Sequence, residues 1–232
     1  MNDPAARPEV DRRPSFDEPP ARSFFHYVGR PLQGWQRLVI VGLCIALGLS
    51  FAFPLWRISM TAPQYPNGLY LDIWTYRVTG GDDGQHISEI NTLNHYIGMR
   101  RIERETLHDL DWLPFALGGL VLLGLRTALL GNVRTLIDMA MIAAYVTLFA
   151  FGRFIYMLWQ YGHELDPEAP MNIEPFTPVI FGSKKVANFM TYSYPQPGSY
   201  LLGVFVVGLW AVVGVALWSG WRSRRRLAMP VT

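Results

Sequence analysis

The sequence predicts a mainly α-helical integral membrane protein with four transmembrane helices and a small mixed extracytoplasmic module built from two long loops. Half of the 232 residues are hydrophobic and only 16 % are charged, whereas soluble domains carry about 25 % charged residues. The apolar residues gather in four blocks, each long enough to cross the hydrocarbon core of a bilayer. Basic residues concentrate near the chain ends and in the turn between the second and third blocks, which gives the four helices one consistent orientation.

The four apolar blocks place the expected spans at residues 38–56, 112–130, 135–159 and 200–218. Trp35 and Trp56 bracket the first span, as interfacial aromatic belts do, and Pro54 lies near its end, where a missing backbone donor costs little. Residues 131–134 form a tight turn. The single cysteine, Cys44, excludes an intramolecular disulfide, and we expect it to act as a small buried apolar residue.

The distribution of basic residues predicts that both termini are cytoplasmic. Twelve arginines fall on the side of the termini and seven basic residues on the side of the long loops, 57–111 and 160–198. We therefore expect both long loops to be extracytoplasmic. The first set is Arg7, Arg12, Arg13, Arg22, Arg30, Arg37, Arg126, Arg134, Arg222, Arg224, Arg225 and Arg226, and the second is Arg57, Arg77, Arg100, Arg101, Arg104, Lys184 and Lys185.

The terminal segments lack the apolar surface that folding requires. Residues 1–22 are rich in proline and charge, so we expect a disordered cytoplasmic tail. They are not expected to be a signal peptide, since no apolar core follows within the first 30 residues. Residues 23–37 form an interfacial lead-in, and residues 219–232 form a basic cytoplasmic tail.

Two ionisable residues lie within the third span. Asp138 follows Arg134 by four residues, so a local ion pair is expected. Arg153 lies about 22 Å further along the helix, too far to reach Asp138. We expect Arg153 to extend to the interface or to meet Asp109 or Asp111 beside the second span.

The first long loop divides into a strand at 69–78, a turn at 80–84, a helix at 89–99 and a second helical piece at 102–110. The strand is predicted from alternation and from its aromatic and β-branched residues. The helix is predicted from apolar residues at i, i+3 and i+7, which form its buried face.

The helix at 89–99 also carries the residues with the richest chemistry. Asn91, His95 and Met99 fall at i, i+4 and i+8, which would place them in one stripe. Gly98 marks a helix break or a close approach of another segment. Prolines disfavour helix in the second loop, which we expect to be a fixed, extended cover packed on the first loop.

Soft metal ligands gather in the two loops. Imidazole and thioether without thiolate suit copper, above all Cu(I), better than zinc or iron. The alternative is structural, with His95 hydrogen-bonded to the second loop and Met99 filling a gap. The candidate ligands are His95, Met99, His163, Met171 and Met190, with Met60, His86 and His108 as weaker candidates.

No catalytic signature points to an enzyme. The sequence has no Ser-His-Asp order, no HExxH motif, no phosphate-binding loop and no haem-attachment motif. No basic stripe with interleaved aromatic residues indicates nucleic-acid binding.

Several motifs resemble a family of small bacterial membrane proteins associated with nitrous oxide reductase maturation and copper handling. These motifs are APQYPNGL at 62–69, EINTLNHYIGM at 89–99, LDPEAP at 165–170, PFTP at 175–178 and ANF at 187–189. The resemblance covers both long loops, and it implies a copper-related or respiratory accessory role with His95 and Met99 as ligands. The sequence departs from the family pattern at Met171, where an aliphatic residue is expected, which weakens Met171 as a ligand.

These observations leave three functions open. The leading expectation is a bacterial inner-membrane accessory protein whose extracytoplasmic module binds or delivers copper, or assists assembly of a copper-dependent respiratory enzyme. Its rival is a non-catalytic subunit of a respiratory or photosynthetic complex that docks a partner protein. The third is a quinone or lipid site near Arg153. The expected partner contacts are Asn91, Asn94, Tyr96, Phe176, Asn188 and Phe189.

Overall fold

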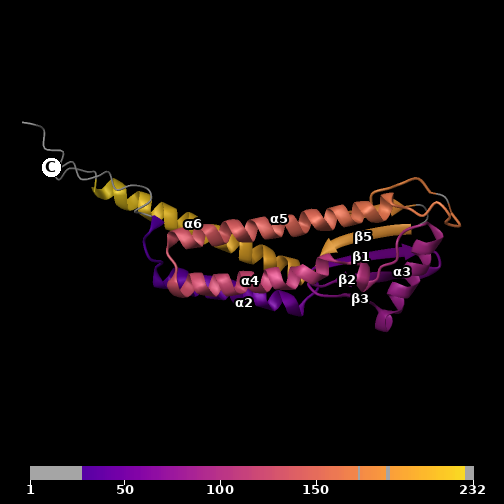
Figure 1. Cartoon of the computed structure of the whole chain (residues 1–232), viewed down its shortest axis with the longest axis horizontal. Helices are drawn as coiled ribbons and strands as arrows, with labels where there is room; N and C mark the ends of the chain where they lie inside the picture. The colour runs from indigo at the N-terminus through magenta and orange to yellow at the C-terminus, as the bar shows by residue number, and fades with distance from the viewer. Residues whose placement is uncertain (1–27, 172, 187–188, 228–232) are drawn as a thin grey trace, which may run out of the picture.

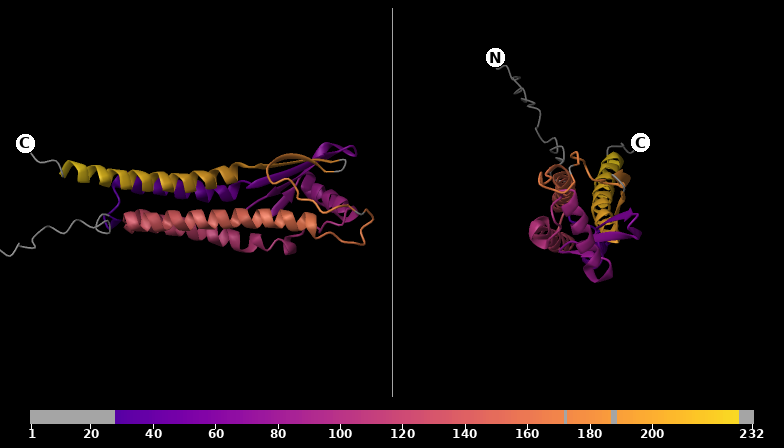
Figure 2. Two further views of the ribbon diagram at one scale, coloured as in Figure 1. Left: turned by 90° about the horizontal axis from the view of Figure 1, so that it is seen from above. Right: turned by 90° about the vertical axis from the view of Figure 1, so that its right-hand side faces the viewer.

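The molecule is elongated, with a bundle of four long helices at one end and a small β-sheet with a covering helix at the other (Figure 1). This computed structural model describes residues 28–171, 173–186 and 189–227. The expected tail at 1–22 therefore lies outside the described residues. In the side view, the bundle and the sheet follow one another along the long axis (Figure 2).

Four helices form the bundle, and each contains a stretch that is long and apolar enough to cross a membrane. These stretches cover residues 34–52, 109–130, 133–163 and 197–219, which confirms four long apolar helices at the expected places. The helices are α2 (Gly34–Leu49, continued by a 3-10 turn over Ser50–Ala52), α4 (Asp109–Leu130), α5 (Val133–His163) and α6 (Pro197–Leu227).

Small residues let the bundle helices approach closely. Helix α2 packs against α4 and α6, and α5 packs against the same two helices. A Cβ atom added at Gly124 would collide with the Cys44 sulfur, and one added at Gly208 would collide with Leu43. Cys44 is buried, which confirms its expected place as a small residue of the membrane helices.

The helix limits differ from the sequence expectation for local reasons. Phe53 is extended, at φ −133° and ψ 149°, because a residue before proline disfavours the helical region. Pro54 therefore ends the first helical segment, and Trp56 begins a strand instead of closing a span. At the other end of the bundle, Asn132 caps α5 by accepting a hydrogen bond from the Thr135 amide at 3.0 Å.

The two long loops combine into one five-stranded antiparallel sheet with the order β3-β2-β1-β5-β4. The central strand β1 pairs with β2 on one side and with β5 on the other. The first loop supplies three strands and the second supplies two, so neither loop forms this sheet alone. The strands are β1 (Trp56–Ala62), β2 (Tyr65–Ile73), β3 (Val78–Gly80), β4 (Gly182–Val186) and β5 (Phe189–Pro195).

The single strand expected at 69–78 is replaced by two strands, because the chain turns at 74–77. The Trp74 amide donates a hydrogen bond to the Arg77 carbonyl at 2.8 Å and closes that turn. The second loop is extended and packs on the first loop, as expected, and it also contributes β4 and β5.

Helix α3 (Gln85–Tyr96) packs on β2 and β3. It ends three residues before Met99, so Met99 does not share the helical stripe expected for it with Asn91 and His95. The helix ends before Gly98, which adopts φ +76°, a conformation that favours glycine. The segment expected to be helical at 102–110 forms only a 3-10 turn over Arg104–Thr106 before α4 begins.

Gly98 is also the point where the second loop meets the first. A Cβ atom added there would lie 2.8 Å from the Asp166 carbonyl oxygen. The Asp166 amide donates to the Gly98 carbonyl at 2.8 Å, and the Met171 amide donates to the Tyr96 carbonyl at 3.0 Å. The expected close approach at Gly98 is therefore confirmed.

Candidate functional site: an apolar chamber between bundle and sheet

An apolar cavity, here called the chamber, lies where the helix bundle meets the sheet. It has a volume of about 410 Å³, within the range of roughly 300–1,000 Å³ that small-molecule sites occupy. Its walls come from β1, β2 and β5, from α3, and from the sheet-proximal ends of α4, α5 and α6. Most of the side chains that line it are apolar or aromatic.

Helix α5 forms one wall because its amphipathic pattern changes halfway along its length. Up to Ala143, its small and medium residues are buried in the bundle core. Beyond that point, large side chains face the chamber at the spacing of one helical face. This face consists of Thr147, Ala150, Phe151, Phe154, Met157, Leu158 and Tyr161.

The sheet forms a second wall through the alternation of its strands. Trp56, Ile58 and Met60 point to the chamber from β1, at the two-residue period of a strand. The Trp56 indole donates a hydrogen bond to the Ser193 hydroxyl at 2.7 Å, and its ring lies 5.1 Å from the Phe154 ring. Trp56 therefore joins the sheet to α5 while its apolar surface stays available to the chamber.

Helix α3 closes a third side, and polar side chains hold it in place. Asn91 receives a hydrogen bond from the Ile102 amide at 2.7 Å and donates one to its carbonyl at 3.1 Å. The Tyr65 hydroxyl on β2 donates to the Glu89 carboxylate, and this bond raises the pKa of Tyr65. Asn94, which is buried, donates to the Arg100 carbonyl at 3.3 Å.

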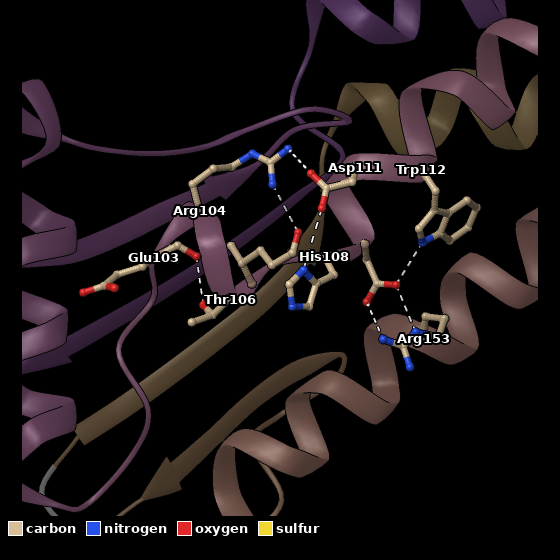
Figure 3. A network of polar contacts seen from close by, with 9 residues as sticks. Glu103, Arg104, Thr106, His108, Asp111, Trp112 and Arg153 are labelled. Atoms are coloured by element: carbon tan, nitrogen blue, oxygen red, sulfur yellow. Dashed lines mark hydrogen bonds and ion pairs between the residues drawn. The ribbon is translucent and has the colours of Figure 1, made fainter.

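The charged groups beside the chamber neutralise one another. Arg153 on α5 makes two hydrogen bonds to Asp109 at the start of α4, at 2.9 and 3.2 Å, which confirms the pairing expected for Arg153. The Trp112 indole donates to the same carboxylate at 3.0 Å, and Arg104 pairs with Asp111 nearby (Figure 3). The attraction between the paired charges and their hydrogen bonds offset part of the cost of placing charge next to an apolar cavity.

The ion pair expected between Arg134 and Asp138 is absent from the described part of the chain, where the ion pairs lie mainly near the sheet. The four-residue spacing brings two side chains to one helix face, but it does not make them meet. No ion pair among the described residues involves Asp138.

Of the expected copper ligands, only His95 and Met99 border the same hollow. His95 and Met99 border one polar hollow together with Arg100, Glu164 and Asp166. His163, at the end of α5, stacks on Trp159 with ring centroids 4.5 Å apart, and it does not border the hollow. Met171 is 52 % exposed and is held by its backbone amide.

The hollow supplies an incomplete donor set for copper. Two of its side chains are soft ligands, and Glu164 is already paired with Arg100. In the described part of the chain, no group of three His, Cys, Asp or Glu side chains converges on one point. Cu(I) favours several soft ligands, so this hollow does not fit it without a further one.

The expected partner contacts fall into three groups. Asn91 and Asn94 are used in internal hydrogen bonds, and Phe176 and Phe189 line the chamber. Tyr96 is half exposed. Asn188 lies outside the described residues.

Sequence reasoning missed the main residues of the chamber. In the sequence, Thr147, Phe151 and Phe154 belong to an apolar span and Trp56 to an aromatic belt, and neither pattern by itself indicates a cavity. The available signal was the change along α5 from small buried residues to large aromatic ones at helical spacing.

The fold and the chamber define a class of protein, one with four helices long and apolar enough to cross a membrane and with polar loops that build a sheet over an apolar cavity. No protein-family model, curated protein or solved structure matches the chain. The function therefore has to be inferred from the chamber itself.

Proposed function

We propose that this protein is a membrane-embedded binding protein that takes an apolar chain, from a lipid or an isoprenoid, into the chamber. The observation that carries this proposal is the chamber of about 410 Å³ with an almost wholly apolar lining. Pockets of this size and lining, with a few placed polar groups, are the default sites for small ligands. The proposal assigns no catalytic role to the chain.

The energetics favour an apolar occupant. An apolar ligand in the chamber removes the lining side chains from water, and each Å² of apolar surface buried in this way contributes about 25 cal/mol. Water is a poor occupant because it needs two to four polar partners, and the hydrogen-bonding groups of Asp109, Asn94 and Ser199 already have protein partners.

The location of the chamber suits a ligand supplied by the bilayer. It borders the ends of three candidate membrane helices, where a lipid chain has a short path. The excess of basic residues at the other end of the bundle supports cytoplasmic termini. We accordingly place the chain in a bacterial inner membrane, with the chamber and sheet toward the extracytoplasmic side.

A glycine pair on α6 gives a direct test of binding. Gly203 lines the chamber, and a Cβ atom added there meets no atom within 4 Å. The Gly203→Phe side chain is expected to fill part of the chamber and to lower the bound lipid or isoprenoid at least five-fold. The measurement is mass spectrometry of organic extracts from the purified protein.

Gly214→Phe is the matched control, because Gly214 lies on the same helix, also has open space around its Cβ position, and does not line the chamber. This variant should retain the wild-type amount of extracted ligand. Equal ligand in both variants, or no co-purifying apolar molecule in the wild type, would refute the proposed function.

Copper handling is the second candidate function, and it is favoured by the shared position of His95 and Met99 at the hollow. If it holds, the purified protein carries stoichiometric copper or binds Cu(I) tightly, and His95→Ala combined with Met99→Ala abolishes this. Elemental analysis and a Cu(I) competition assay measure it, with His163→Ala as the control that leaves copper unchanged. Wild-type protein without Cu(I) affinity would exclude the hollow as a copper site.

Docking to a respiratory partner protein remains a prediction. Large apolar side chains on the sheet and beside it are exposed, Phe181 by 67 % and Tyr194 by 44 %. Co-purification from the native membrane is the measurement that addresses it.

A further inference from the structure

Helix α5 extends past the sheet-side ends of the other bundle helices and runs beside the sheet (Figure 1). Arg153 on α5 pairs with Asp109, the first residue of α4. The ring of Trp56, which follows the first helical segment, lies 5.1 Å from the Phe154 ring. These contacts place Arg153 level with the sheet-side ends of α2 and α4, whereas α5 itself continues to His163.

The level of Arg153 fits one face of the hydrocarbon core. Between this level and the opposite end of the bundle, the helical stretches cover residues 34–52, 109–130, 133–153 and 197–219. At 1.5 Å per residue these stretches are about 28–35 Å long, close to the roughly 30 Å thickness of the hydrocarbon core. The interface on the side of the sheet therefore falls near Arg153, and the sheet stands beyond it.

One turn of the sheet points back to this interface. The Ile73 carbonyl, at the end of β2, accepts a hydrogen bond from the Leu55 amide at 2.7 Å, and the first apolar stretch ends only three residues earlier, at Ala52. The β2–β3 turn at 74–77 follows directly, so it lies at the bundle end of the sheet. The β1–β2 turn at 63–64 lies at the opposite end of β2, about 27 Å away at 3.4 Å per residue.

The β2–β3 turn presents two aromatic rings and a guanidinium group. The Arg77 guanidinium lies 4.8 Å from the ring centroid of Trp74 and 5.3 Å from that of Tyr76. The Trp74 indole donates to the Thr79 hydroxyl at 2.8 Å, and Thr75 is buried, so the turn is held in one shape. Tyr76 and Arg77 are exposed. Side chains with an apolar body and a polar end are typical of the membrane–water interface.

Arg77 differs from the other arginines of the first long loop in its lack of an acidic partner. The others form the pairs Arg57–Asp72, Arg100–Glu164, Arg101–Glu103 and Arg104–Asp111. No ion pair within residues 28–171, 173–186 and 189–227 involves Arg77. Phosphate is the anion that a bilayer surface supplies, and a guanidinium group binds it through paired N–H donors.

Resting on the membrane placement proposed above, and not on the occupant of the chamber, we infer that the β2–β3 turn is a lipid anchor. Trp74 and Tyr76 enter the headgroup layer, and Arg77 binds a phospholipid phosphate. A soluble anion would account for Arg77 alone, whereas the two rings and the level of the turn favour the bilayer. The anchor adjoins the chamber, since Ile73 and Val78, on either side of the turn, both line it.

Nitroxide labels measure the depth of the turn in the full chain, reconstituted in phosphatidylcholine nanodiscs. Cys44→Ala is the background, because Cys44 is the single cysteine of the chain. Tyr76→Cys labels the turn, Gln64→Cys labels the far end of β2, and Leu122→Cys labels an exposed position in the middle of α4. Depth is read from the ratio of collisions with oxygen, which concentrates in lipid, to collisions with a water-soluble nickel chelate.

We expect the oxygen-to-nickel ratio to be highest at position 122, and at position 76 to exceed the ratio at position 64 at least about three-fold, as an interfacial site should. Equal ratios at positions 76 and 64, with position 122 deep, would overturn the anchor and leave the membrane placement intact. An aqueous ratio at position 122 would refute the membrane placement itself, and the anchor with it.

Hydrogen exchange tests the phosphate contact without a label. The Trp74 amide closes the turn by donating to the Arg77 carbonyl at 2.8 Å. This amide should exchange about three- to ten-fold more slowly in nanodiscs than in dodecyl maltoside, which has no phosphate, because opening the turn also breaks a charge-assisted hydrogen bond. Arg77→Gln should lose most of this difference. Arg101→Gln is the control that keeps it, since Arg101 is exposed elsewhere in the same loop.

Inorganic phosphate, added in excess to the protein in dodecyl maltoside, separates a lipid from a soluble anion. We expect it to leave the exchange of the Trp74 amide unchanged. Full protection by inorganic phosphate would identify a soluble-anion site and overturn the lipid anchor. An undiminished difference between nanodiscs and detergent in Arg77→Gln would overturn the role of the guanidinium group.

Discussion

Gly162→Ala is expected to destabilise the sheet end of the molecule by about 1–3 kcal/mol, the range for overpacking. A Cβ atom at Gly162 would overlap the Phe176 carbonyl oxygen and crowd the Pro178 ring. The Phe176 amide also donates to the Gly162 carbonyl at 2.9 Å, and this bond fixes the second loop on α5. Because Phe176 and Pro178 line the chamber, the substitution should also loosen one of its walls.

Thermal unfolding in detergent and hydrogen exchange at the Phe176 amide measure the two effects. The matched control is Gly152→Ala, since Gly152 lies on the same helix and has no atom within 4 Å of its Cβ position. That variant should be neutral or stabilising by up to about 1 kcal/mol, from helix propensity alone. Equal melting temperatures for the two variants would show that the second loop is not anchored at Gly162.

Asp109→Asn is expected to cost roughly 1–3 kcal/mol, between the values for exposed and buried ion pairs. The Asp109 side chain is 17 % exposed and that of Arg153 is 38 % exposed, so solvent screens the pair only in part. The substitution leaves the Arg153 guanidinium without its carboxylate inside a candidate membrane helix, where an unpaired charge is unfavourable.

A double-mutant cycle isolates this interaction. Arg153→Gln combined with Asp109→Asn should cost less than the sum of the two single substitutions, with a coupling of about 1 kcal/mol or more. Asp111→Asn, two residues further along α4, is the control, because the Asp111 side chain is 60 % exposed and its Arg104 partner is 44 % exposed. It should cost less than about 1 kcal/mol. Zero coupling in the cycle would mean that Arg153 is stabilised by solvent rather than by Asp109.

Membrane helices were the part of the fold that sequence reasoning predicted best. Long uncharged runs have few alternatives, because a backbone in hydrocarbon must satisfy its hydrogen bonds within one helix. The pairing of Arg153 with an acid beside the second span also followed from the cost of an unpaired charge at that depth. Gly98 was predicted as a break or a close approach, and it is both.

The sheet was predicted only in part. Strand β1, with Trp56, Ile58 and Met60 on one face, begins at the last residue of the predicted first span and continues into the first long loop, where no strand was expected before residue 69. Its pairing with β5 joins Trp56 to Pro195, residues that are far apart in the chain. Such pairings depend on how the two loops meet in space, which local periodicity does not encode.

The sequence by itself determined the four long apolar helices, the extended second loop and the supply of soft ligands, since these depend on composition and on local backbone preference. Only the tertiary structure decided which side chains meet. It placed His95 and Met99 at the polar hollow, which His163 and Met171 do not border, and it lined the chamber with Phe176 and Phe189. A cavity exists only where several elements pack together, so its position follows from three-dimensional contacts and not from any one segment.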